Sequence, residues 1–258
     1  MIVGIIQARM SSTRLPGKVM LKVGNVPLLQ HMIERVSQSE KLDKIIVATT
    51  TNQVDDIIEN LCKKMDIGCF RGSEDDVLLR YKNAAESIQA KTVVRLCGDC
   101  PLIDSEIIDH VIDTYLKENY DYVSNLFPSP RTYPDGTSVE IFSSELLNKT
   151  ERNAKKPSER EHVTFYIWMQ PEKFKIHRID LEKDLSQFRF NLDYKEDYDL
   201  IKQVFQKFLP KNKFFKIGDV VSWLESNSEI FRINSHIISQ QGWKKSFEED
   251  RERGFNAD

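Results

Sequence analysis

The chain has 258 residues, of which 40% are hydrophobic and 30% are charged. This length and composition suffice for the core of one large α/β domain with at most a small subdomain. Its 37 Lys and Arg against 40 Asp and Glu give a formal net charge of −3, which disfavours binding to nucleic acid through a basic face. No apolar run approaches the ~20 residues of a membrane span, and the start lacks a signal-peptide pattern. We therefore expect a cytoplasmic protein without nucleic-acid or membrane partners.

The first half of the chain alternates short β-rich runs with amphipathic helical stretches. Buried strands are predicted at residues 2–7, 45–48, 67–70 and 92–96. Helical spacing of apolar residues predicts helices between these strands and again at 107–116. This alternation is typical of an α/β fold with a mostly parallel central sheet.

The second half begins with a long loop marked by prolines and by Asp135-Gly136, which precedes an alternating strand at 137–142. We interpret residues 125–170 as an inserted loop and strand region that covers the active edge of the sheet. Ser158 and Glu161 form a capping-box pattern for a helix that reaches about Met169.

Farther along, strands are predicted at 175–179 and 188–192, and a helix at 195–208. Residues 1–210 are therefore predicted to form the main domain. Residues 211–258 read as a charged stretch, a short helix and a polar tail at the periphery.

The most informative segment is the loop that follows the first strand. It places three cations, Arg9, Arg14 and Lys18, among small residues whose backbone N–H groups can approach an anion. Open α/β sheets bind ligands at the carboxyl ends of their strands. The position and charge of this loop indicate a polyphosphate site, although three cations on a solvated loop are the plain alternative.

At this loop the sequence resembles the CTP-dependent cytidylyltransferases that activate acidic sugars, such as the CMP-Kdo and CMP-sialate synthetases. Within that group it is most similar to the spore-coat-polysaccharide type, over roughly residues 1 to 235. The motifs that carry the likeness are Ala8-Arg9, Ser12 to Lys18, Gly72-Ser73, Asp76 to Leu78, Arg80-Tyr81, Gly98 to Asp104, Pro134 to Gly136, Glu140, Glu161 to Thr164, Asn191 to Asp193 and Glu196-Asp197.

The resemblance implies a Rossmann-like nucleotidyltransferase fold, and a homodimer that binds CTP and transfers CMP to an anionic acceptor for surface polysaccharide synthesis. It assigns Arg9, Arg14 and Lys18 to catalysis and to the triphosphate. The other positions that it places near the nucleotide are Ala8, Ser11, Ser12, Ser73, Arg80, Cys97 and Asp99. Arg80 reads equally well as a surface arginine on a helix, and relatives more often carry a Thr or an amide at Cys97.

Two carboxylates follow predicted strands, Asp99 after 92–96 and Asp193 after 188–192. Oxygen ligands that meet at one sheet edge suit Mg²⁺, and the resemblance gives both residues this role. Each aspartate has the alternative role of a helix N-cap.

The acceptor should be recognised by the second half of the chain, where an arginine can pair bidentately with a carboxylate or phosphate. The candidates are Arg131, Asp135, Glu140, Arg160, Glu161 and His162. His162 is either a general base or part of a capped turn. Two other functions stay open: a glycosyltransferase that uses a nucleotide-sugar, and a nucleotide-binding protein without catalysis. Asp99-Cys100-Pro101 lacks the Asp-x-Asp pattern typical of the first.

Overall fold

The computed structural model describes residues 1–237 and 241–255, with the backbone alone over 241–245. A seven-stranded sheet runs through the molecule in the order β5-β4-β1-β6-β8-β7-β9. The strands are β1 (Ile2–Gln7), β4 (Lys44–Thr50), β5 (Gly68–Gly72), β6 (Thr92–Cys97), β7 (Tyr122–Ser124), β8 (Glu140–Ser143) and β9 (Ile176–Arg178). Only β8 is antiparallel to its two neighbours, so the predicted α/β fold with a mostly parallel sheet is confirmed.

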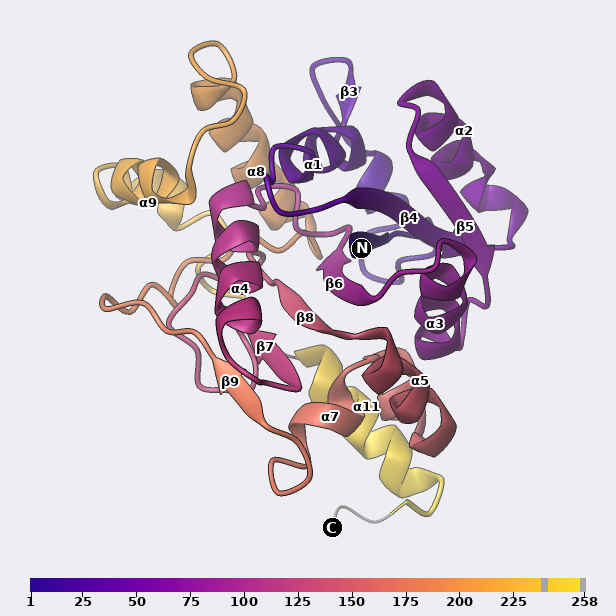
Figure 1. Ribbon diagram of the computed structural model, residues 1–258. Helices are drawn as coiled ribbons and strands as arrows, with labels where there is room; N and C mark the ends of the chain where they lie inside the picture. Colours follow the sequence, from indigo (N-terminus) through magenta and orange to yellow (C-terminus); the bar gives the residue numbers. More distant parts are fainter. Residues whose placement is uncertain (238–240, 256–258) are drawn as a thin grey trace.

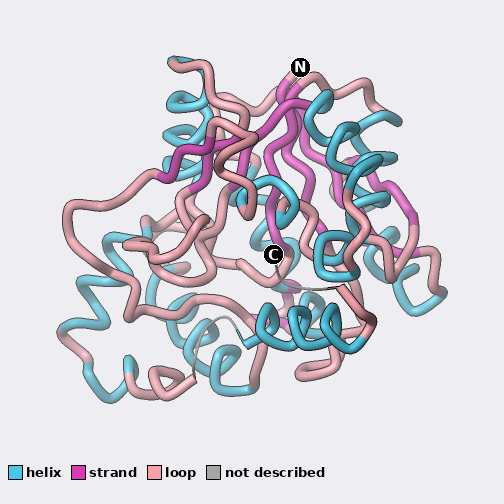
Figure 2. Tube along the Cα trace, turned by 90° about the horizontal axis from the view of Figure 1, so that it is seen from below, coloured by secondary structure: helices cyan, strands magenta, loops and turns pink. Residues whose placement is uncertain are grey.

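Helices cover both faces of the sheet (Figures 1 and 2). Helices α1 (Leu28–Val36), α2 (Asp56–Lys64) and α4 (Ser105–Lys117) share one apolar core with alternate residues of the strands. Helices α3 (Val77–Ser87), α5 (Ser144–Asn153) and α7 (Phe165–Trp168) bury the other face. The strands read as continuous apolar runs because both faces are buried in this way.

A third apolar cluster joins α8 (Lys195–Phe208) and α9 (Ile217–Glu225) to the segment 188–192. Further short elements are η1 (Lys18–Met20), η2 (Gln53–Asp55), α6 (Pro157–Glu161), α10 (Ser228–Phe231), and a hairpin of β2 (Lys22–Val23) and β3 (Val26–Pro27). The last helix, α11 (Gln241–Glu252), packs against α6.

Three predictions about local structure are corrected. The helix expected to run to Met169 is split into α6 and α7, because Val163 between them takes a positive φ of 59° that no helix accommodates. The segment 188–192 makes a single isolated bridge, Asp135 to Arg189, in place of a strand ladder. The polar tail, for which we predicted no helix, contains α11.

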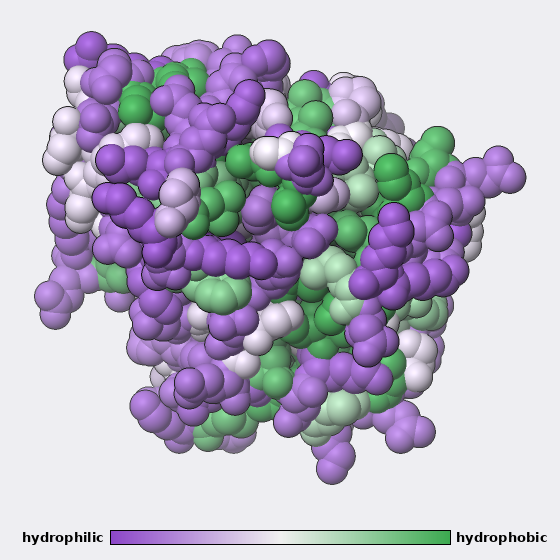
Figure 3. Space-filling model, turned by 90° about the horizontal axis from the view of Figure 1, so that it is seen from above, coloured by the Kyte–Doolittle hydropathy of each residue, from purple (hydrophilic) through white to green (hydrophobic). Residues whose placement is uncertain are grey.

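The face seen from above is largely hydrophilic, with hydrophobic side chains showing in patches (Figure 3). The large hydrophobic residues that are exposed in the described chain are Met1, Val54, Ile57, Leu116 and Met169. Among the described residues, every helix is too short or too polar to cross a membrane.

His31 of α1 offers a test of the packing between α1 and α8. Its ring stacks on Phe205 at 4.5 Å, and its Nε2 has no hydrogen-bond partner in the described chain. Burial lowers the pKa of His31. Below a pH of about 6.5 the unfolded chain therefore binds a proton at His31 more readily than the folded chain does. The free energy of unfolding should fall as the pH drops below this value, by at most about 1.4 kcal/mol per pH unit.

His31→Leu removes this proton-binding difference. Urea unfolding between pH 5 and 7 should therefore show a shallower pH slope for His31→Leu than for the wild-type chain. An unchanged slope would mean that other groups cause the dependence.

Candidate active site

The loop after β1 leaves the sheet between β4 and β6, at the carboxyl ends of three parallel strands. Asp55 anchors its start. This buried carboxylate accepts hydrogen bonds from the backbone N–H of Met10 at 2.8 Å and from Thr49 Oγ1 at 3.1 Å. Gly17 ends the loop with a φ of 70°, and Lys18 opens η1 immediately afterwards. The three loop cations are thus carried on a backbone that is fixed at both ends.

At the end of β6 the backbone of Gly98 lies against the end of β1. The Gly98 N–H donates to the Gln7 carbonyl at 2.8 Å, and a Cβ at this position would come within 2.6 Å of the same oxygen. Only glycine permits this approach. It brings Asp99, the next residue, alongside the loop cations.

Lys18 joins the two candidate metal ligands. Its Nζ lies 2.8 Å from Asp99 Oδ2 and 2.9 Å from Asp193 Oδ1. Arg14 adds a second cation, with Nη2 2.6 Å from Asp193 Oδ1. The backbone also links the two acids, since the Leu192 N–H donates to the Asp99 carbonyl at 2.8 Å. Residues 18, 99 and 193, far apart in sequence, therefore form one charged cluster.

The electrostatics of this cluster favour the charged forms of Asp193 and Lys18. Burial by itself would raise the pKa of Asp193, but the charges of Lys18 and Arg14 outweigh it and hold that pKa well below its usual range. Burial likewise opposes the charge on Lys18, yet the two carboxylates raise its pKa above the usual value. Asp193 is thus an anion, and Lys18 a cation, throughout the neutral range.

Arg189 is a buried cation that contacts the charged cluster through Asp193. It is buried at 6% exposure, and its guanidinium contacts Asp197 at 2.9 Å, Asp135 at 2.9 Å and Asp193 at 3.3 Å. Asp197 also accepts from the backbone N–H groups of Asp193 and Tyr194 at the start of α8. Gly136, with a φ of 84°, lets the loop pass so close to residues 190–191 that a Cβ would sit 2.3 Å from the Asn191 nitrogen. This contact holds Asp135 beside Arg189.

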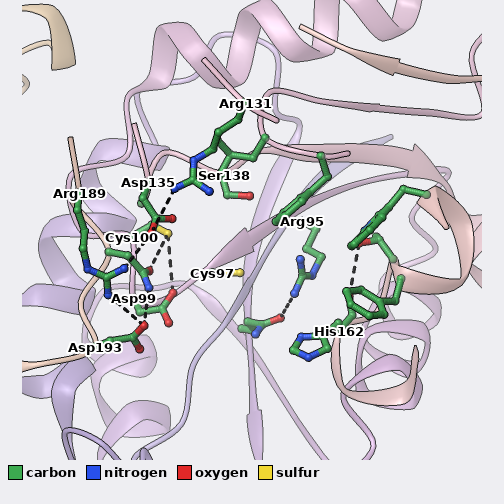
Figure 4. A pocket seen from close by; sticks show the side chains of 18 of the residues that line it. Arg95, Cys97, Asp99, Cys100, Arg131, Asp135, Ser138, His162, Arg189 and Asp193 are labelled. Carbon is green, nitrogen blue, oxygen red and sulfur yellow. Dashed lines mark hydrogen bonds and ion pairs between the residues drawn. The ribbon is translucent and has the colours of Figure 1, made fainter. Parts of the chain in front are cut away.

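Two adjoining cavities open on this cluster. The loop-side cavity, of about 260 Å³, is bordered by the loop residues Arg9, Ser12, Arg14 and Lys18. The arginine-side cavity, of about 230 Å³, is bordered by Arg131 and Arg189 and by the aromatic residues Phe127, Phe165 and Trp168 (Figure 4). Five residues line both cavities and mark their boundary: Gln7, Arg14, Arg95, Asp99 and His162.

Comparison with known proteins identifies the family. The family model described as "Cytidylyltransferase" matches residues 3–237. The chain belongs to the cytidylyltransferase family.

Two relatives are similar to this chain over most of their own length. The chain is 39% identical over 238 residues to uncharacterized protein MJ1063 of Methanocaldococcus jannaschii, which covers 92% of this chain and 95% of that protein. It is 36% identical over 213 residues to the spore coat polysaccharide biosynthesis protein SpsF of Bacillus subtilis, covering 80% and 87%. The likeness to the spore-coat type is therefore confirmed.

Solved structures of other proteins are similar to this chain as well. A cytidylyltransferase from Leptospira borgpetersenii is similar with a TM-score of 0.85 and 37% identity, covering 90% of this chain and 96% of that one. A CMP:2-keto-3-deoxy-manno-octonic acid synthetase, complexed with CTP, shares the fold with a TM-score of 0.60 at 15% identity, over 80% of this chain and 98% of that one.

Most of the residues predicted for the site of this cytidylyltransferase line one or both cavities. They are Ala8, Arg9, Ser12, Arg14, Lys18, Arg80, Cys97, Asp99, Arg131, Asp135, Glu161, His162 and Asp193. Cys97 is a neutral thiol here, because burial raises its pKa to about 12.

Four residues predicted for the site line neither cavity. Ser11 donates to Glu74, and the Ser73 hydroxyl accepts from the backbone N–H of Asp76. Glu140 is fully buried and pairs with Arg95. Arg160 reaches across to Asp76, with its Nε 3.0 Å from Oδ2, and to Glu151. In the structure these four residues make contacts that hold the backbone around the site.

Among the cavity-lining residues of the cytidylyltransferase that the sequence prediction did not include are Arg95, Arg189 and Asn191. Both arginines are charged residues inside apolar runs of the sequence, Val93-Val94-Arg95-Leu96 and Phe188-Arg189-Phe190. A buried charge needs a partner, so an arginine at such a position is itself a signal for a site. Asn191 stands in one of the family motifs but was given no role; its Nδ2 donates to Asp193 Oδ2 at 2.8 Å.

Proposed function

We propose that this cytidylyltransferase binds CTP and transfers its CMP moiety to an anionic acceptor, either an acidic sugar or a phosphorylated small molecule, with release of pyrophosphate. The observation that carries the proposal is the meeting of Lys18, Asp99 and Asp193 where the loop-side and arginine-side cavities adjoin. The name of the Bacillus relative supports a place in polysaccharide biosynthesis. As the resemblance implies, we also expect a cytoplasmic homodimer.

The loop-side cavity suits the triphosphate. When the acceptor oxygen attacks the α-phosphorus in line, negative charge builds on the departing pyrophosphate, and fixed cations stabilise that charge without reorganising. Arg9, Arg14 and Lys18 line this cavity and supply three such cations. Ala8 and Ser12 line the same cavity beside these cations.

The chemistry of Asp99 and Asp193 fits a magnesium ion. Their oxygens already converge on one positive group, the Lys18 ammonium. In the described chain no cluster of three or more His, Cys, Asp or Glu side chains offers a full set of metal ligands. Mg²⁺ suits such an incomplete set, since it usually takes one or two carboxylates and completes its shell with phosphate and water. When bound, the ion would neutralise charge on the phosphate oxygens.

The arginine-side cavity suits the acceptor. Arg131 is buried at 9% exposure, and its Nε has no hydrogen-bond partner among the described residues. Its Nη2 lies 3.6 Å from Asp135 Oδ2, too far for a close hydrogen bond. A guanidinium with unused donors in a cavity is suited to a carboxylate or phosphate, which it can bind bidentately.

A pyrophosphate-release screen tests the proposal. Each of the four nucleoside triphosphates is combined with Mg²⁺ and with a panel of acidic sugars and phosphorylated small molecules. We expect release with CTP and with one acceptor class. Release of nucleotide from a nucleotide-sugar, without pyrophosphate, would identify a glycosyltransferase.

The Asp99→Asn variant separates an enzyme from a binding protein. We expect it to fold normally, as judged by circular dichroism, and to lose metal-dependent turnover. A wild-type chain that binds CTP in calorimetry but never releases pyrophosphate would show that the function is binding alone.

A further inference from the structure

His162 lies where the two cavities meet. It is the C-cap residue of α6 and lines both the loop-side and the arginine-side cavity. In Figure 4 it lies across the cavity from Arg131 and Asp193. If CTP occupies one cavity and the acceptor the other, as proposed above, the attacking oxygen and the α-phosphorus meet at this boundary. A proton acceptor is useful at that point.

The hydrogen bonds of His162 assign its tautomer. Ser246 Oγ, on α11, lies 2.8 Å from His162 Nε2 and donates its proton to Glu161 Oε2 at 3.2 Å. A carboxylate accepts only, so the Ser246 oxygen is left to accept from the His162 Nε2–H. A neutral imidazole with its proton on Nε2 has a lone pair on Nδ1. In the described part of the chain, Nδ1 makes no hydrogen bond.

The C-terminal helix is firmly attached where Ser246 reaches the site. Asp250, buried at 3% exposure, accepts from the backbone N–H of Ser158 at 3.0 Å and also from the Ser158 hydroxyl. The Phe247 ring packs on Phe165 with centroids 5.0 Å apart. These contacts fix α11 against both α6 and α7, so the position of Ser246 relative to His162 is set by packing.

The backbone beside His162 is strained. Val163 has a φ of 59° and is fully buried, an unfavourable conformation for a β-branched residue. Thr164 then donates to the buried Glu140. This hydrogen bond to Glu140 ties the α6–α7 corner, which carries His162, to the buried end of β8.

We infer that His162 is the general base of the transfer, and that Ser246 on the C-terminal helix, together with Glu161, is a positioning residue that holds its tautomer. This inference rests on the proposed function. It brings α11, which lies outside the matched family region of residues 3–237, into the active site.

In the transfer step two bonds break and two bonds form. The acceptor O–H bond breaks and its proton passes to His162 Nδ1, while the acceptor oxygen forms a bond to the α-phosphorus. The bond from that phosphorus to pyrophosphate breaks, and its electron pair leaves with pyrophosphate. The imidazolium then returns the proton to water. An acceptor that attacks through an ionised phosphate has no such proton, so the base matters only for hydroxyl attack.

The charges around His162 come from several elements. Glu161 on α6, Glu140 on β8 and Asp250 on α11 favour its protonated form, whereas burial and Arg95 on β6 oppose it. Burial has the largest effect and lowers the pKa of His162 below its usual value. The ring is therefore neutral near pH 7 and ready to accept a proton, and activity should fall on the acid side as it protonates.

His162→Gln tests the inference, because a glutamine amide can still donate toward Ser246 but cannot act as a base. With Mg²⁺, CTP and the hydroxyl acceptor found in the screen, we expect kcat to fall by about 10²–10⁴-fold, with the acid limb of the pH profile abolished. CTP affinity by calorimetry should stay close to that of the wild-type chain. Ser246→Ala should give a smaller fall and shift the acid limb.

The exposed His110, on α4, provides the matched control, and His110→Gln should behave like the wild-type chain. The inference is overturned if His162→Gln keeps its kcat or its acid limb, or if the working acceptor attacks through a phosphate. Absence of any turnover by the wild-type chain would instead overturn the proposed function and this inference together.

Discussion

Replacing Lys18 by glutamine should lower kcat with CTP by about 10²–10³-fold. The Lys18 ammonium is held at 2.8 and 2.9 Å from two carboxylates and lines the loop-side cavity. In the proposed reaction it faces charge that grows as pyrophosphate departs. Glutamine keeps a hydrogen-bond donor of similar length but removes the positive charge.

The kinetic pattern distinguishes this role from simple binding. A cation that acts mainly on the developing charge contributes to kcat more than to KM. Steady-state pyrophosphate release should therefore show a larger change in kcat than in KM for CTP. Lys22→Gln, at an exposed lysine of β2, serves as the control and should retain full activity. A Lys18→Gln variant that changes KM alone would assign Lys18 to uniform substrate binding.

Replacing Arg189 by methionine should reduce the free energy of unfolding by about 3–5 kcal/mol. Arg189 balances Asp197, which is fully buried, and also contacts Asp135 and Asp193. Methionine fills part of the same space but leaves the Asp197 carboxylate without its counter-charge. The backbone N–H groups of Asp193 and Tyr194 and the Asn234 amide still donate to Asp197, so the chain should fold at low temperature.

Urea unfolding measures this loss directly. Arg178→Met is the matched control, because Arg178 pairs with the more exposed Asp180 at 2.8 Å, and its loss should cost at most about 1 kcal/mol. Equal destabilisation by the two variants would show that the buried cluster around Arg189 adds nothing beyond a surface ion pair.

Much of the fold could be predicted because its signals are local. The helix at Lys195–Phe208 was predicted with the bounds that the structure has, since apolar residues repeat at helical spacing. The break at Val163 could not be predicted, because a positive φ in a valine is enforced by tertiary contacts. The segment 188–192 has the composition of a strand, but it packs on α8 and the loop around Gly136, and within the described residues its β-pairing is limited to the isolated bridge with Asp135.

The site residues likewise divide into those that could be predicted from the sequence and those that could not. The ends of the strands can be located from sequence periodicity, and beside them lie Arg14, Lys18 and Asp99. The convergence of these residues therefore follows from the topology of a parallel sheet. Glu140 and Arg160 have the right chemistry for an acceptor site, yet each is used by an internal ion pair. Which of several charged residues faces a cavity depends on side-chain partners from distant segments, and sequence spacing does not determine it.

The hydrogen bond from the Leu192 N–H to the Asp99 carbonyl joins the two acidic segments through the main chain. The distance between their carboxylates is therefore insensitive to most amino-acid exchanges nearby. Arg131, Ser138 and Phe127, by contrast, reach the arginine-side cavity from one long loop. If this cavity holds the acceptor, as proposed above, homologous enzymes can diverge in the molecules they modify by altering that loop, while the phosphate chemistry is retained.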